Sequence, residues 1–363
     1  YFRPLGDPAE RVWTYNIGMV ASPTFMLLSG MMLGLLFHTK RDGFGKISAG
    51  LADRGLFMLT AGHLLIMLTC IPRSGSFGQA ARLGFITDAV GVAVILGPLV
   101  VVRTRAGARL AAALGLYLSG LLLTMAWFPE GALPRAIKQV LAGPYPEATP
   151  NTFPFLPWLG VYLAGTVLGE WLGRCYQAGD ARAAERGILK LGAAGVAVAV
   201  LCKAAMWTAG SVGLHGLGDP AGWAYQLTSP WRKLPPSPVY LAFFGGAGML
   251  LVGMVLMAER RQLFGRYMDW ASVLGRNSLF VFIAQFYVYY LGFYYLRLPY
   301  TPFWPLYFAA SVAGLAMLAR VWDERGWNRY LTLRRAPAAP SRPAVAFTGE
   351  HSTQQVAGAS QAA

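Results

Sequence analysis

The stretch SPTFMLLSGMMLGLLFHTKR, residues 22–41, decides the fold of this chain. Its apolar part is long enough to cross a bilayer as a helix, which takes about 20 residues. It also contains Pro23 and the pair Ser29-Gly30, and it ends in a basic cluster. The stretch therefore predicts a membrane-spanning helix with a small-residue notch at its centre.

Runs of this kind recur along the 363 residues, of which 55% are hydrophobic and only 13% charged. A soluble domain carries about a quarter charged residues. The apolar period is helical and lacks the alternation of an outer-membrane barrel. We predict an all-α fold, a polytopic transmembrane helix bundle with about nine spans, near residues 15–37, 55–72, 83–102, 110–128, 155–173, 187–208, 238–257, 273–296 and 302–319.

The basic residues are distributed unevenly between the loops on the two sides of the membrane. With the N-terminus outside, 21 of the 31 Lys and Arg residues fall on the inner side, nine on the outer side, and Lys203 within a span. This is the positive-inside bias, so the net charge of +15 needs no nucleic-acid partner. We expect a multi-pass protein of a bacterial cytoplasmic (inner) membrane with a cytoplasmic C-terminus. An outside Tyr1 also predicts a further helix upstream, or about ten spans in all.

The connections are short, which predicts one transmembrane domain over residues 1–330. Residues 331–363 have few apolar residues and are predicted to form a disordered cytoplasmic tail. Within the spans, small residues four apart predict close helix packing, at Gly30 and Gly34 and again at Gly165 and Gly169. Glu170 and Arg174, also four apart, predict an ion pair along one helix.

Two ionisable residues lie inside apolar runs, where charge is costly and usually serves a function. Asp88 stands in LGFITDAVGVAVILG and His63 in RGLFMLTAGHLLIML. Asp88 is predicted to face the bundle interior and to have a polar partner on a neighbouring span. A proton acceptor, a ligand anchor and half of a buried ion pair remain open for it. For His63 the alternatives are a functional and a hydrogen-bonded packing role.

Basic residues gather at the inner ends of several spans. Such a cluster suits the phosphates of a nucleotide-bearing cofactor through charge-assisted hydrogen bonds, although topology alone also explains it. The candidates are Lys40, Arg41, Arg54, Arg103, Arg105, Arg276 and Asn277. The three cysteines are scattered and predict no metal site.

Four segments together resemble the transmembrane acyltransferases, and most closely the heparan-α-glucosaminide N-acetyltransferase catalytic-domain family. They are SPTFMLLSGMMLG, LADRGLFMLTAG, FPFLPWLGVYLAGTVLG and LGRNSLFVFIAQF. The segment with Phe-Pro-x-x-Pro-Trp-x-Gly is the most specific of the four. The resemblance covers residues 13–300, most of the chain.

The resemblance implies an integral membrane acyltransferase. It would move an acyl group from cytoplasmic acyl-CoA, with acetyl-CoA favoured as donor, to a sugar or glycan outside. Arg54 and the pair Arg276-Asn277 would then bind the donor phosphates, and the Ser-Gly notch would border the channel of its pantetheine arm. Asp88 and His63 are the catalytic candidates, and Trp158, Trp223 and Trp231 the substrate-binding ones. For the last two, a membrane-surface aromatic belt remains the alternative.

The chain departs from the family pattern at two positions. The family's reactive histidine follows its first span, but residues 1–14 contain no His, and Gln285 stands where many relatives have one. An alternative function is a proton-coupled transporter or flippase for a sugar or lipid-linked substrate, with Asp88 and His63 as the relay. A membrane scaffold is a third possibility. The expected partners are membrane lipid and the glycan acceptor, and a homodimer stays open.

Overall fold

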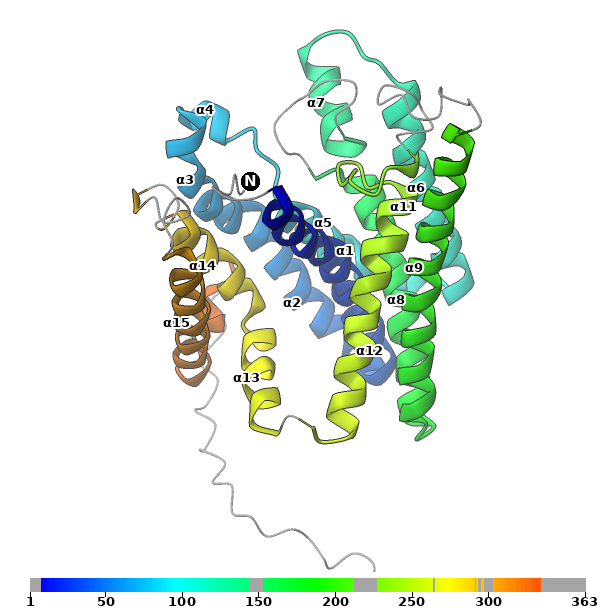
Figure 1. The fold of residues 1–363 in the computed structure, drawn as a ribbon. Coiled ribbons are helices and arrows are strands. Elements are labelled where there is room, and N and C mark those ends of the chain that lie inside the picture. Colours follow the sequence, from blue (N-terminus) through cyan, green and yellow to red (C-terminus); the bar gives the residue numbers. More distant parts are fainter. Residues whose placement is uncertain are drawn as a thin grey trace, which may run out of the picture. The chain divides into compact units, whose positions relative to one another are not determined.

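We describe the protein from a computed structural model, over residues 8–143, 153–211, 227–263, 265–290, 292, 295–296 and 303–333. These residues form helices and connecting turns, without a β-strand among them (Figure 1). The expected all-α fold is therefore confirmed. Most of the tail predicted over residues 331–363 lies outside the described residues.

The long helices follow the predicted spans. Eight segments are long and apolar enough to cross a membrane, and a sharply bent pair of helices makes up to nine in the part of the chain that is described. The helices are α1 (Pro8–Thr39), α2 (Phe44–Phe57), α3 (His63–Ser74), α4 (Phe77–Ala80), α5 (Ile86–Arg103), α6 (Ala106–Ala126), α7 (Ala132–Leu141), α8 (Phe155–Gln177), α9 (Ala181–Ser211), α11 (Pro238–Tyr240), α12 (Gly246–Arg260), α13 (Gly265–Arg276), α14 (Ser278–Tyr290) and α15 (Trp304–Glu324).

Short turns that are not α-helical precede, join or follow some of these helices. The turn η1 (Arg41–Gly43) begins the second span, and the π-helical turn η2 (Met58–Gly62) joins α2 to α3. A second π-helical turn, η4 (Leu241–Gly245), joins α11 to α12, and η7 (Trp327–Tyr330) follows α15.

Two spans differ in detail from the prediction. The second one runs as a continuous helical segment from Arg41 to Pro72, so that Arg54, expected in an inner loop, lies within it. The cause is an apolar face on α2, where Phe44 is buried and Leu51 packs against the core. The eighth, expected over residues 273–296, consists of α13 and α14, whose axes meet at 87° around Asn277.

The helices α1 and α8 pack backbone against backbone through their glycines. A Cβ on Gly30 or Gly34 would collide with the carbonyl oxygens of Tyr162 and Thr166 on α8. A Cβ on Gly165 or Gly169 would collide in turn with carbonyl groups on α1. The predicted close packing is therefore confirmed. The notch at Gly30 receives the backbone of α8, and the channel expected beside the Ser-Gly pair stays a prediction.

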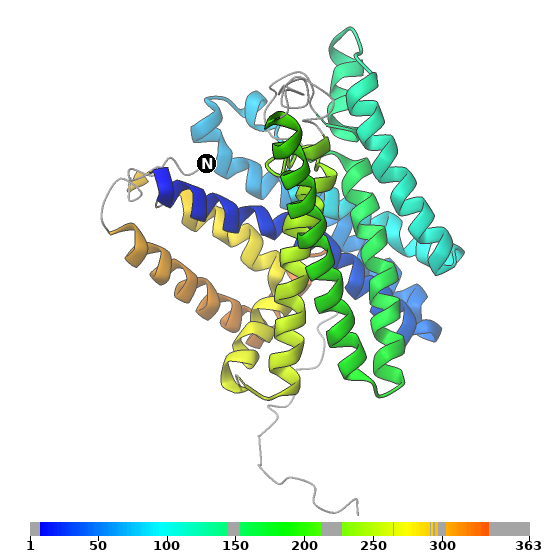
Figure 2. The ribbon, with the colours of Figure 1, turned by 45° about the vertical axis from the view of Figure 1, so that its right-hand side comes forward.

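A second close pair is formed by α9 and α12, which lie side by side in both views (Figures 1 and 2). Gly192 and Gly195 of α9 face Gly246 and its neighbours at the start of α12. Leu27 of α1 packs against the cluster that contains Met249 of α12. The α9–α12 pair therefore joins the bundle built on α1 and α8.

The last three helices form a separate group, which we call the C-terminal group (α13, α14, α15 and η7). The helix α15 packs on α13, α14 and η7, and α14 packs on α3. Aromatic side chains dominate the contacts: Phe280 stacks on Trp322 with ring centroids 4.1 Å apart. On the other side of α14, Phe282 stacks on Phe25 of α1 at 6.2 Å.

Candidate functional site

His63 and Asp88 meet across two spans. The Nδ1 atom of His63 lies 2.9 Å from Oδ1 of Asp88, and the two side chains are 25% and 11% exposed. The other carboxylate oxygen of Asp88 accepts a hydrogen bond of 2.7 Å from the backbone N–H of Phe85, the residue before α5. The predicted polar partner for an inward-facing Asp88 is therefore confirmed.

The local structure explains how each side chain reaches this position. Asp88 occupies the first turn of α5, where a carboxylate satisfies a free backbone donor and interacts favourably with the helix dipole. His63 directly follows the π-helical turn η2, and such turns often occur at functional sites. The carboxylate of Asp88 thus stabilises the start of α5, and the pairing uses only one of the two ring nitrogens of His63.

The pairing determines the tautomer of His63. Because a carboxylate only accepts, Nδ1 carries the proton and Nε2 of a neutral ring is an acceptor. No group of the described residues bonds Nε2, and the ring of Phe85 lies tilted at 5.3 Å from the imidazole. A histidine held in this way by a carboxylate is arranged to take a proton from a ligand at Nε2.

Arg54 lies on the span that ends in α3, and Arg276 lies at the break before α14, which packs on α3. The Tyr287 hydroxyl donates to the carbonyl of Leu65 at 2.8 Å, and Tyr290 lies 3.6 Å from Cys70, so that α14 runs parallel to α3. These pairs are 222 and 220 residues apart in sequence. Both arginine side chains are exposed.

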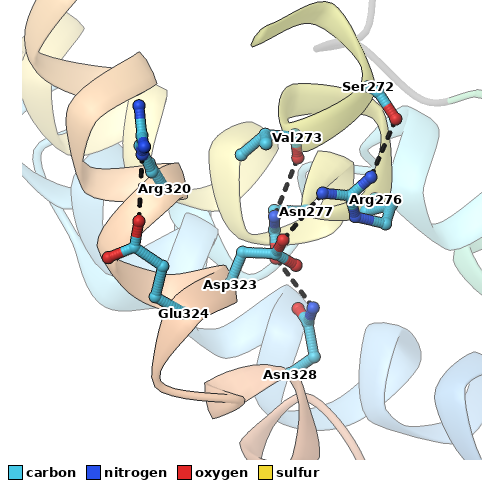
Figure 3. A network of polar contacts seen from close by, with 8 residues as sticks. All are labelled: Ser272, Val273, Arg276, Asn277, Arg320, Asp323, Glu324 and Asn328. Carbon is cyan, nitrogen blue, oxygen red and sulfur yellow. Dashed lines mark hydrogen bonds and ion pairs between the residues drawn. The ribbon is translucent and has the colours of Figure 1, made fainter. Parts of the chain in front are cut away.

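Arg276 is already held by two neighbours. Its Nη1 donates to Ser272 Oγ and its Nη2 to Asp323 Oδ2, each at 2.8 Å (Figure 3). The side chain remains 52% exposed, so its remaining donors are open to a ligand. Asn277, in contrast, is 1% exposed, and its amide bonds within the chain to Val273 and Asn328.

The other predicted phosphate ligands form a second group at one end of the bundle. Lys40, Arg41, Arg103 and Arg105 are all exposed there. Leu33, near the end of α1, packs against Gly97, near the end of α5. On α2, Gly55 lies against Gly91 and Ile95 of α5, about 10 residues before Arg103. Arg54 is therefore separated from this second group by roughly 15 Å along the helices.

The tryptophans predicted to bind substrate have different environments. Trp158 is fully buried, 5.9 Å from the ring of Phe153, and its Nε1 has no hydrogen-bond partner among the described residues. Trp231 is 48% exposed in the segment before α11 and lies 6.1 Å from Phe244. Trp223 lies outside the described residues. Their proposed role stays a prediction.

Sequence reasoning missed one buried ion pair. Arg109, assigned to an inner loop, is 1% exposed on α6, where it pairs with Glu170 of α8 and lies 3.5 Å from Thr166 Oγ1. The predicted pair of Glu170 with Arg174 is present at 3.8 Å but secondary. No signal in the spacing could have shown this, because Arg109 and Glu170 are 61 residues apart. No cluster able to hold a metal occurs among the residues described.

Comparison with protein families gives one match. The model of the family "Heparan-alpha-glucosaminide N-acetyltransferase, catalytic" covers residues 5–190, slightly more than half of the 363 residues. This chain belongs to that family. As a member it is a multi-pass membrane protein of the acetyltransferase class. No curated protein and no solved structure matches the chain.

The range matched by the acetyltransferase family divides the candidate residues. His63, Asp88 and Arg54 lie within residues 5–190, and so does Trp158. The pair Arg276-Asn277 lies beyond them, although its segment also resembled the family in sequence. The structure joins the two parts, since α14 packs on α3 and Ile283 of α14 shares a cluster with Phe57 of α2.

Proposed function

We propose that this acetyltransferase transfers an acyl group, acetyl in the first place, from cytoplasmic acyl-CoA to a hydroxyl or amine of a sugar on the extracytoplasmic side. The observation that carries the proposal is the pairing of His63 Nδ1 with Asp88 at 2.9 Å, which leaves Nε2 as a proton acceptor. Family membership supports the reaction class.

In the proposed reaction, His63 Nε2 takes the proton from the acceptor hydroxyl or amine as that group attacks the thioester carbonyl carbon. Asp88 holds the ring and stabilises the imidazolium that forms. The tetrahedral intermediate then collapses, the carbon–sulfur bond breaks, and the imidazolium returns its proton to the departing coenzyme thiolate. The products are an ester or amide and free coenzyme A.

The donor would enter from the basic end of the bundle. Lys40, Arg41, Arg103 and Arg105 would attract its phosphates there, and Arg54 and Arg276 would bind phosphate further in. The charge distribution supports this direction, since 21 of the 31 basic residues fall on the side predicted to be cytoplasmic. His63 lies beyond Arg54 on the same helical segment, towards the opposite side.

The acceptor would approach from the side of the loops before α8 and α11. Aromatic side chains there suit the apolar faces of sugar rings, and Trp231 is exposed among them. We extend the proposal to Trp158 and Trp223 as sugar contacts and to the bacterial inner membrane as location. A second copy of the chain is a further proposed partner.

The proposal is tested with the purified full-length protein, by following release of free thiol from acetyl-CoA in the presence of a panel of sugars. His63→Ala should lower turnover by about 10²–10⁴-fold, the usual contribution of a positioned general base. Asp88→Asn should lower it by a comparable factor, because the Asn oxygen that still accepts from Phe85 N–H leaves the amide NH2 facing Nδ1, which places the ring proton on Nε2.

His38→Ala is the matched control. His38 bonds Gln177 at 2.8 Å where α1 and α8 end, and it plays no part in the proposed chemistry. It should retain turnover. Full activity of the His63→Ala protein would overturn the assignment of the base. A parent protein that releases no thiol with any sugar, but moves sugar across liposomes in response to a pH gradient, would favour the transporter alternative.

A further inference from the structure

The break between α13 and α14 is held by the C-terminal end of α15. Asn277, at the break, accepts a hydrogen bond of 2.7 Å at Oδ1 from Nδ2 of Asn328 in η7. Its own Nδ2 donates to the carbonyl of Val273 at 2.7 Å, one turn back on α13 (Figure 3). Both polar ends of this buried amide are therefore occupied within the protein.

Asn328 is itself held in place by a further residue, Trp322. Its Oδ1 accepts from the indole N–H of Trp322 at 3.2 Å, and that indole stacks on Phe280 of α14. One residue further along, Asp323 pairs with Arg276 at 2.8 Å. Leu331, which follows η7, is 8% exposed in the cluster that also holds Phe57 of α2. The segment of residues 322–331 thus contacts both sides of the break.

This arrangement limits what Asn277 can do. The amide of Asn277 is 1% exposed and therefore out of reach of a ligand, whereas the neighbouring Arg276 is half exposed and has free donors. The orientation of the guanidinium depends on where α13 ends and α14 begins. Asn277 lies at that point and accepts a hydrogen bond from Asn328.

We infer that Asn328 is a positioning residue for donor binding: through Asn277 it fixes the helix break that presents Arg276 to the phosphates of acyl-CoA. The inference rests on the proposed function, and it extends the donor site to a segment more than 130 residues beyond the family match, which ends at residue 190. The segment of residues 322–331 then contributes to the donor site.

The test compares kinetic constants of full-length variants with acetyl-CoA and a sugar that the parent protein uses. Asn328→Ala should raise KM for acetyl-CoA about tenfold, the effect expected from losing one well-formed hydrogen bond. Its kcat and its KM for the acceptor should stay within about twofold of the parent values. Asn328→Gln, which keeps an amide donor, should recover part of the donor affinity.

Trp322→Phe is the matched control. It removes the supporting hydrogen bond of Asn328 but keeps an aromatic ring against Phe280 and the direct bond to Asn277, so that KM for acetyl-CoA should rise less than in Asn328→Ala. A merely structural role would lower the melting temperature and kcat without a donor-specific change in KM. That result for Asn328→Ala would overturn the inference.

The outcomes also separate the inference from the proposed function. If the parent protein uses acetyl-CoA and Arg276→Ala weakens its binding, but Asn328→Ala binds it normally, only the inference fails. If calorimetry shows no binding of coenzyme A by the parent protein, the proposed function and the inference both fail.

Discussion

The α1–α8 pair and the C-terminal group are held together by different means. In the first, glycines let two backbones touch, and an added Cβ at any of four positions would collide with a carbonyl group. In the second, long side chains reach between helices: Phe280 stacks on Trp322, and Arg276 pairs with Asp323. The first interface leaves no room for adjustment, whereas the second depends on separable contacts.

The difference matters for function, because each candidate group rests on one type of packing. Asp88 lies in the first turn of α5, which packs on α1 and α8, and His63 is held against it. Arg276 belongs to the C-terminal group, whose contact with the rest of the bundle includes the packing of α14 on α3. We therefore expect substitutions in the α1–α8 bundle to affect the folding of the whole protein. Substitutions in the C-terminal group should affect the stability of that group alone.

The largest effect is expected from Gly169→Val. A side chain at this position would collide with the backbone of Met31, so α1 and α8 would have to separate. We expect a loss of more than about 5 kcal/mol in the free energy of unfolding, the range of exceptional single substitutions. In practice, size-exclusion chromatography should show no folded peak.

Gly115→Val is the control for this substitution. Gly115 is also in a helix, α6, but a Cβ there would meet nothing within 4 Å. The same residue change should therefore leave the folded peak intact. A folded, stable Gly169→Val protein would show that the contact between α1 and α8 is adjustable after all, and the comparison would lose its basis.

A smaller but still large effect is expected from Glu170→Ala. It leaves the guanidinium of Arg109, 1% exposed, without its carboxylate. Breaking a buried ion pair by removing one partner typically costs about 3–5 kcal/mol. Arg174→Ala, which removes the weaker and more exposed contact at 3.8 Å, should change the free energy of unfolding by less than about 1 kcal/mol. Equal effects in SDS titrations would contradict the assignment of Arg109 as the main partner.

These two interfaces also show what could be read from the sequence. The spacing of Gly30, Gly34, Gly165 and Gly169 predicted close packing, because a period of four residues places small side chains on one helix face. The apolar runs likewise predicted the spans, since length and hydropathy are local properties. Both kinds of information lie within about 20 residues of sequence.

The rest was not predictable because it depends on pairs that are distant in sequence. Asn277 and Asn328 are 51 residues apart, and Arg276 and Asp323 are 47 apart. Nothing in the motif Arg-Asn-Ser-Leu distinguishes an asparagine that binds a ligand from one that holds a helix break. His63 and Asp88 were each singled out as polar residues in apolar runs, but their pairing required the register of α3 and α5.

The third prediction concerns the C-terminal group alone. Phe280→Leu removes the ring that stacks on Trp322 but keeps an apolar side chain, so it should cost about 1 kcal/mol. Phe308→Leu on α15, where the ring is 60% exposed, should cost less. Hydrogen exchange should show faster exchange in α14 and α15 for Phe280→Leu and no change in α1 or α8. Uniform loosening of the whole chain would mean that the two regions unfold as one unit.

The last effect, confined to high pH, is expected at Lys233, in the segment before α11. Its Nζ lies 5.2 Å from the ring centroid of Phe153, the residue before Pro154 at the start of α8. Burial lowers the pKa of Lys233 from 10.5 to about 8. This side chain connects the segment before α11 to the segment before α8. Its protonation therefore depends on how well these two segments exclude water from the ammonium group.

The lowered pKa gives the sign of a pH effect. Between about pH 8 and pH 10.5 the unfolded chain keeps a proton that folded Lys233 has released, so stability should rise with pH in this window. Relative to Lys233→Met, the free energy of unfolding of the parent protein should increase by about 1 kcal/mol from pH 8 to pH 10, less than the full linkage value because the ammonium keeps some contact with water and with the ring. Below pH 8 both states are protonated, and the difference between the two proteins should stay constant. A constant difference up to pH 10 in SDS titrations would show that Lys233 remains solvated and that the loops at this end are open.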